Sequence, residues 1–172
     1  PGSTRDPSGF AWLAGETRAL HRRPGWVQTG RNDHAGMDEM RQLIAGNWKM
    51  HGLGRDAVAL ARAVAAGAQG LPADLLVCPP FLHVAAVAQA VAGTPVAVGG
   101  QDCHAAKQGA HTGDVSAPML ADAGATWVIL GHSERRQNHH ETDAQVRDKT
   151  LAAIEAGLRP IVCVGETEAE RM

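Results

Sequence analysis

Two short polar clusters in this 172-residue chain carry side chains suited to carbonyl or acid–base chemistry. The first is Asn47 with Lys49, directly after an apolar run, and an amide beside an ammonium group suits a phosphorylated or carbonyl substrate. Because alternate residues of a strand point to the same side, we predict that both side chains face one direction. A turn-forming asparagine and a solvated lysine fit the same residues.

The second cluster is the run GHSERR at residues 131–136, in which His132 follows another apolar run. If a helical turn begins at Ser133, its free backbone N–H groups disfavour a positive charge on His132. A neutral imidazole can donate a hydrogen bond to a substrate carbonyl. A structural histidine in a loop is the alternative.

From Met40 onward, short apolar runs alternate with helical patterns. The predicted strands cover residues 42–47, 74–78, 96–101, 126–131 and 159–165. The predicted helices cover residues 55–67 and 81–91, a stretch from a Ser116 cap to Gly124, and a stretch from Thr142 to Gly157. In the last helix, we expect Val146, Thr150, Ala153 and Ile154 to face inward. Residues 102–115 are predicted to be a loop.

The repeated strand–helix unit predicts parallel strands joined by right-handed crossovers. Continuous apolar runs, such as residues 127–130, are typical of a sheet buried on both faces. Ligands of such folds bind at the carboxyl ends of the strands, where both polar clusters lie. Periodicity leaves two architectures open. A flavodoxin-like open sheet, serving as a binding domain, predicts strand order 2-1-3-4-5, whereas a barrel segment predicts 1-2-3-4-5.

Composition narrows the class of protein. The net charge of −2 favours neither nucleic acid nor an anionic membrane as the main partner. No stretch approaches the roughly 20 apolar residues that span a bilayer, and the beginning of the chain lacks the apolar segment of a signal peptide. Cys78, Cys103 and Cys163 have no close pairing, which indicates thiols in a reducing compartment. We therefore expect a cytoplasmic protein.

A zinc enzyme using His139, His140 and Cys163 is a weak alternative. Adjacent histidines project in different directions, and no metal-ligand spacing recurs in the sequence.

Residues 1–39 differ from the rest because glycine and proline interrupt them repeatedly. We expect an irregular extension of unknown role, with one helical turn near residues 15–21, followed by a domain at 40–172. The first residue is proline, and Met37 or Met40 could be the natural start. A targeting or docking arm is the alternative interpretation of this segment.

Four motifs together resemble the triosephosphate isomerase family. Residues 45–50 (AGNWKM) resemble its first strand and loop, and residues 124–136 (GATWVILGHSERR) resemble its fourth-strand motif. Thr112 and Gly113, within residues 109–114 (GAHTGD), resemble the tip of its dimer loop. Residues 163–167 (CVGET) resemble the end of its fifth strand. The four motifs follow the order and spacing of the family.

The resemblance implies a (β/α)8 TIM barrel, of which this chain contains about the first five strands. It also implies a homodimer, no cofactor and no metal. The implied activity is that of an aldose–ketose isomerase of glycolysis and gluconeogenesis, which interconverts dihydroxyacetone phosphate and glyceraldehyde 3-phosphate.

The resemblance also implies a role for each site residue. Asn47 and Lys49 would contact substrate, and Lys49 would supply positive charge near the phosphate and the developing enediolate oxygen. His132 would act as a neutral electrophile, for which this family is the established example. The supporting residues would be Glu134, Ser133 and Thr112. Glu134 would be the ion-pair partner of Lys49, and Thr112 would reach the neighbouring subunit and support Asn47.

Several parts of the family's site are missing from this sequence. The family's base is a glutamate at the end of the sixth strand, and its lid and phosphate loops come later, whereas this chain stops at Met172. Glu166 belongs to the fifth-strand motif, so we interpret it as a structural carboxylate. We expect the chain alone to be inactive and to aggregate through exposed strand edges. A pseudoenzyme that keeps the ancestral motifs is the alternative.

Overall fold

The apolar runs form five strands in the computed structural model, which describes residues 42–165. The strands are β1 (Gln42–Asn47), β2 (Ala73–Cys78), β3 (Val96–Gly100), β4 (Trp127–Leu130) and β5 (Arg159–Val162). Every strand begins within one residue of its predicted start, while β5 ends three residues earlier than predicted. The predictions for residues 1–39 and for Glu166 lie outside the described residues.

Helical segments connect the strands. They are α1 (Gly54–Gly67), the short 3-10 helix η1 (Phe81–His83), α2 (Val84–Ala90), α3 (Ala117–Asp122), α4 (Ser133–His139) and α5 (Asp143–Glu155). The predicted cap of α3 is confirmed, because Ser116 Oγ accepts a hydrogen bond from the backbone N–H of Met119. Thr142 and Gln145 form a capping box at the start of α5. No helix within residues 42–165 is both long and apolar enough to cross a membrane.

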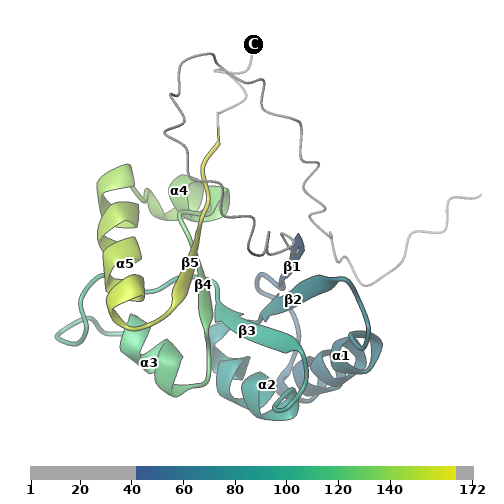
Figure 1. The fold of residues 1–172 in the computed structure, drawn as a ribbon. Coiled ribbons are helices and arrows are strands. Elements are labelled where there is room, and N and C mark those ends of the chain that lie inside the picture. The colour runs from purple at the N-terminus through teal and green to yellow at the C-terminus, as the bar shows by residue number, and fades with distance from the viewer. Residues whose placement is uncertain (1–41, 166–172) are drawn as a thin grey trace, which may run out of the picture.

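The five strands are parallel and lie side by side in the order in which they occur along the chain. This order confirms the barrel segment and contradicts the flavodoxin-like sheet, whose first strand would lie between the second and the third. Figure 1 shows α1, α2, α3 and α5 along one side of the curved sheet, as right-handed crossovers require. The carboxyl ends of all the strands therefore meet at one edge.

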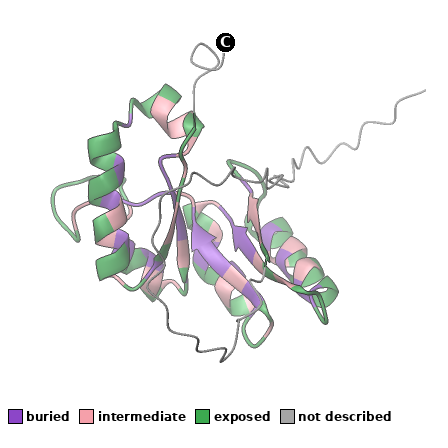
Figure 2. Cartoon of the chain, turned by 45° about the horizontal axis from the view of Figure 1, so that its top comes forward, coloured by how far each residue is buried: buried purple, intermediate pink, exposed green. Residues whose placement is uncertain are grey.

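Apolar side chains cover both faces of the sheet because successive strand residues point to opposite faces. Val77, Val128 and Leu130 belong to the large core cluster, which also contains the buried faces of the helices. Their strand neighbours Cys78 and Ile129 belong to a second, smaller cluster on the other face. Figure 2 shows the buried residues concentrated along the central strands.

One prediction about the core is wrong. Ile154 is 57% exposed, although we expected it to face inward on α5. The buried positions of this helix are Val146, Lys149 and Ala153, which follow one another at three- and four-residue intervals. Ile154 is one position, or about 100°, beyond that face. The charged residue Lys149 lies inside instead, because it has ionic partners there.

The close packing of β3 against its neighbours predicts a site-specific loss of stability. A β-carbon at Gly99 would lie 2.9 Å from Cys78 Sγ and 3.1 Å from the backbone oxygen of Trp127. We expect Gly99→Ala to lower the free energy of unfolding by about 1–3 kcal/mol, measured by urea denaturation. Gly67→Ala is the control, because nothing lies within 4 Å of its β-carbon position at the end of α1. Equal stability of the two variants would contradict the packing argument.

Candidate active site

The ends of β1 to β4 surround an open cavity of about 600 Å³. Four of the six predicted site residues line it, namely Asn47, Lys49, His132 and Glu134. The remaining lining residues are Met50, His51, Pro80, Phe81, Gln101, Asp102, Arg135, Asn138 and His139. The topology thus brings residues from four separate strand ends into one cavity.

Asn47 and Lys49 share the cavity for a reason other than the one predicted. Strand β1 ends at Asn47, so the alternation of strand side chains does not extend to Lys49. Instead, Asn47 Oδ1 accepts a hydrogen bond of 3.0 Å from the backbone N–H of Lys49, which closes a side-chain turn. The φ angle of Lys49 is +52°, in the left-handed region that non-glycine residues seldom adopt. This strain at a cavity wall is typical of functional positions.

Gln101 stabilises this strained turn from the end of β3. Its side-chain Nε2 donates one hydrogen bond of 2.9 Å to the backbone oxygen of Lys49 and another of 2.8 Å to that of Cys78. The backbone N–H of Trp48 also donates to Cys78, at 3.0 Å. Sequence reasoning missed Gln101, although a polar residue at the end of a predicted strand was a usable signal.

Lys49 and Glu134 form an ion pair across the cavity, with Nζ 2.8 Å from Oε1. The resemblance anticipates this contact, while the roles of both residues in catalysis stay predictions. The hydrogen bond from Lys49, together with the lysine's charge, lowers the pKa of the Glu134 carboxyl below its usual value. Both side chains are more than 40% exposed, so the pair adds little to stability. The main effect of the pair is to hold the Lys49 ammonium group in one position beside Glu134.

His132 caps α4, which begins at Ser133 as the sequence suggested. Its Nδ1 atom accepts a hydrogen bond of 3.2 Å from the backbone N–H of Glu134. An accepting Nδ1 has a free lone pair, so the neutral ring carries its proton on Nε2. Nδ1 also lies 3.6 Å from Glu134 Oε2, but that longer contact is an ion pair only if the ring is protonated. The backbone hydrogen bond therefore assigns the tautomer.

A buried ionic cluster underlies the cavity. Lys149 Nζ lies 2.9 and 2.8 Å from the two carboxylate oxygens of Asp102 and 2.5 Å from Glu141 Oε1. Arg135 Nε lies 2.9 Å from Asp102 and 2.5 Å from Glu141. Two cations balance two carboxylates, so the cluster is neutral overall. It connects the end of β3 to α4 and α5.

Ser133 and Thr112 lie apart from the cavity. Ser133 is exposed at the first position of α4, and Thr112 is exposed in the turn at residues 111–114. The zinc alternative receives no support, because no metal-binding group within residues 42–165 includes His139, His140 or Cys163.

The cavity has groups that can polarise a carbonyl and attract an anion, because His132, Asn47 and Lys49 all line it. Among the described residues 42–165, the carboxylates that line it are Asp102 and Glu134, and both are ion-paired. Sequential parallel strands with such a site at their carboxyl edge define the class of (β/α)8-barrel enzymes.

The comparisons with known proteins specify the family within this class. The triosephosphate isomerase family profile matches residues 42–172. The triosephosphate isomerase of Xanthobacter flavus is 62% identical over 133 residues, which are 77% of this chain and 53% of that protein. That of Ruegeria pomeroyi is 59% identical over 131 residues, covering 76% of this chain and 52% of that protein. The chain belongs to the triosephosphate isomerase family.

The structural comparison agrees. The crystal structure of triosephosphate isomerase from Bartonella henselae matches with a TM-score of 0.73 and 46% sequence identity, covering 77% of this chain and 55% of that chain. The described strands are therefore part of a TIM barrel. The chain spans about half the length of the relatives that it matches.

The Lys49–Glu134 pair predicts an unusual titration. We expect the Glu134 carboxyl, followed by NMR, to titrate below its usual pKa of 4.5 because the ionised form accepts a hydrogen bond from Lys49. A lowered folded-state pKa means that the pair's stabilisation is complete above pH 4.5 and is lost as the pH falls through the lowered value. In Lys49→Met, the pKa should return toward 4.5. An unchanged pKa in that variant would contradict the assigned cause.

The buried cluster predicts a large loss of stability when one cation is removed. Lys149→Met leaves Asp102 and Glu141 with only Arg135, so we expect the free energy of unfolding to fall by about 3–5 kcal/mol. Urea denaturation measures this effect. The control is Lys107→Met, whose exposed pair with Glu155 should contribute less than about 1 kcal/mol. A Lys149 variant as stable as that control would show that the buried cluster is not required.

Proposed function

We propose that residues 42–172 supply the carbonyl-polarising half of a triosephosphate isomerase active site, which interconverts dihydroxyacetone phosphate and glyceraldehyde 3-phosphate. The hydrogen bond from the Glu134 backbone to His132 Nδ1 is the observation that carries this proposal. It leaves Nε2–H as a neutral donor beside the cavity. Such a donor can polarise the substrate carbonyl and exchange a proton with the enediolate.

In this proposal, Lys49 stabilises negative charge on the substrate. Glu134 and the turn at Asn47 fix its side chain and backbone, so the ammonium group is positioned before the substrate arrives. Positioning before reaction increases the stabilisation of a developing oxyanion, because no reorganisation is needed at that moment. Asn47 contributes an amide along the same wall.

The base that removes a proton from carbon is proposed to come from a segment other than residues 42–165. Within that described range, the carboxylates that line the cavity are Asp102 and Glu134, and each is already paired with a cation. The lowered pKa of the Glu134 carboxyl makes it a weak base. Asp102 is held by Lys149 and Arg135 in the buried ionic cluster and is not free to take a proton from carbon. We therefore propose that the 172-residue chain alone does not turn over substrate.

We also propose that a second copy of the protein docks at the loop that carries Thr112. Thr112 is exposed, and the large apolar side chains Met50 and Leu82 are 93% and 90% exposed. A homodimer interface would cover such side chains.

The free thiols Cys78, Cys103 and Cys163 support action in the reducing cytoplasm.

A hybrid enzyme tests the proposal directly. Residues 40–172 would be fused to the part of the Xanthobacter flavus enzyme that follows its matched segment. We expect this hybrid to isomerise glyceraldehyde 3-phosphate in a coupled assay, while the 172-residue chain alone gives no turnover. In the hybrid, His132→Gln should lower kcat by about 10²-fold or more, because the neutral donor is lost.

The control is His140→Asn, which removes an imidazole that does not line the cavity. Asparagine tolerates the left-handed φ of +56° at this position. A folded hybrid without activity would indicate a pseudoenzyme, and full activity in His132→Gln would contradict the role of the histidine.

A further inference from the structure

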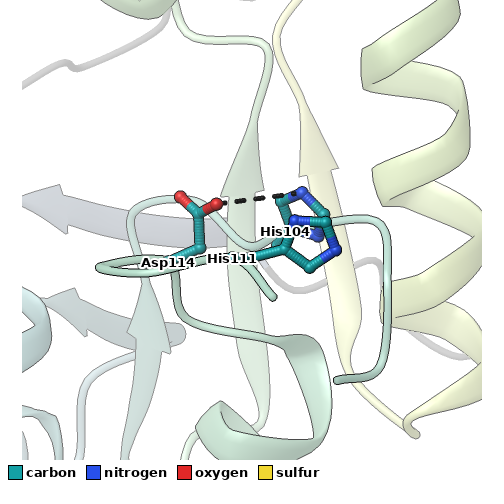
Figure 3. Close-up of side chains that lie close together, drawn as sticks. All are labelled: His104, His111 and Asp114. Atoms are coloured by element: carbon teal, nitrogen blue, oxygen red, sulfur yellow. Dashed lines mark ion pairs between the residues drawn. The ribbon is translucent and has the colours of Figure 1, made fainter. Parts of the chain in front are cut away.

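A cluster of potential metal ligands lies in the loop between β3 and α3, apart from the candidate active site. His104, His111 and Asp114 each place one ligand atom within 4.8 Å of those of the other two. His104 Nε2 lies 3.8 Å from Asp114 Oδ2, and the two imidazole rings lie 4.0 Å apart between their centroids. Figure 3 shows the three side chains gathered on one side of the loop.

Backbone hydrogen bonds determine this arrangement. The N–H of His104 donates to the oxygen of Val115 at 2.8 Å, which closes the base of the loop beside Asp114. The N–H of Asp114 donates to the oxygen of His111 at 3.0 Å, so these two ligands lie at the ends of a single turn. Gly113, with φ of +91°, allows that turn. The cluster is thus built into the backbone of the loop.

We propose that His104, His111 and Asp114 bind one divalent transition-metal ion. Two imidazole nitrogens and one carboxylate oxygen are the donor set that suits Zn²⁺, and three protein ligands leave a fourth position for water. Bonds of about 2.0–2.1 Å in tetrahedral geometry put ligand atoms about 3.4 Å apart, so the cluster must contract by roughly an ångström. The rings, tilted by 33°, must also turn apart. His111 and Asp114 are exposed, which allows both movements.

The charges around the loop leave the cluster available to a cation. The neighbouring side chain of Lys107 is paired with Glu155 at 2.6 Å. Lys149 and Arg135, which line a pocket together with His104, are neutralised within the buried ionic cluster. Within residues 42–165, the ionic partner of Asp114 is His104, which is not a permanent cation.

Metal binding changes one hydrogen bond in this loop. His104 Nδ1 accepts a hydrogen bond of 3.0 Å from the backbone N–H of Ala106, so its neutral ring carries the proton on Nε2. Coordination through Nε2 requires that nitrogen to lose its proton, and the ring's remaining proton then lies on Nδ1. The contact with Ala106 is therefore given up, and the loop backbone near that residue moves on binding.

The site also affects the loop tip, because Thr112 lies between His111 and Asp114 in the same turn. This consequence rests on the proposed function, in which Thr112 meets a second subunit. The metal site itself depends only on the three ligands, so its test uses the 172-residue chain without any assay of activity.

Titration of the 172-residue chain with Co²⁺, followed by its visible absorption, tests the proposal. We expect one equivalent of Co²⁺ to bind with the intense spectrum of a tetrahedral site, and Zn²⁺ to displace it. His111→Ala and Asp114→Asn should each weaken binding by about tenfold or more, since each removes a ligand. Circular dichroism checks that these exposed positions leave the fold unchanged.

His140→Asn is the matched control, because it removes an exposed imidazole outside the cluster and should leave Co²⁺ affinity unchanged. The absence of a tetrahedral spectrum in the parent chain would overturn the proposal. Equal affinity in the parent chain, His111→Ala and Asp114→Asn would also overturn it, by showing that other residues hold the ion.

Discussion

Parallel pairing of consecutive strands is the constraint on which the remainder of this structure depends. Each connection must carry the chain from the carboxyl end of one strand back to the amino end of the next, and the helices occupy those return paths. All carboxyl ends then share one edge. Asn47 and His132, distant in the sequence, lie along the same cavity for this reason. Removing the pairing would separate them even if each motif kept its local conformation.

The sheet edge brings the residues together, and local hydrogen bonds then orient them. The strained backbone at Lys49 persists because Asn47 and Gln101 hydrogen-bond to it from two sides. The backbone of α4 determines the tautomer of His132. Below the cavity, the neutral ionic cluster attaches the base of α4 to α5 without leaving a net charge in the interior. The orientation of the site residues therefore depends on few contacts, most of them to backbone atoms.

The sequence predicts the strands well, because their apolar runs are short, continuous and separated by clear helix caps such as Ser116. It predicts the site less completely. The turn at Lys49 depends on a single side-chain hydrogen bond, which a strand pattern cannot reveal. The hydrogen bonds of Gln101 depend on the pairing of β1, β2 and β3. Lys149 occupies an apolar helix face, and this pattern could have indicated a buried partner. The partner itself could be identified only from the fold, because Asp102 follows β3 and lies far from Lys149 in the sequence.

Our central proposal is that a neutral His132 presents Nε2–H to the substrate. Nitrogen-15 NMR of the imidazole ring tests this claim most directly, because the two ring nitrogens have different chemical shifts when only one carries a proton. At neutral pH, the account predicts a protonated Nε2 and an unprotonated Nδ1 for His132. A proton on Nδ1, in either the other tautomer or the imidazolium, would contradict it.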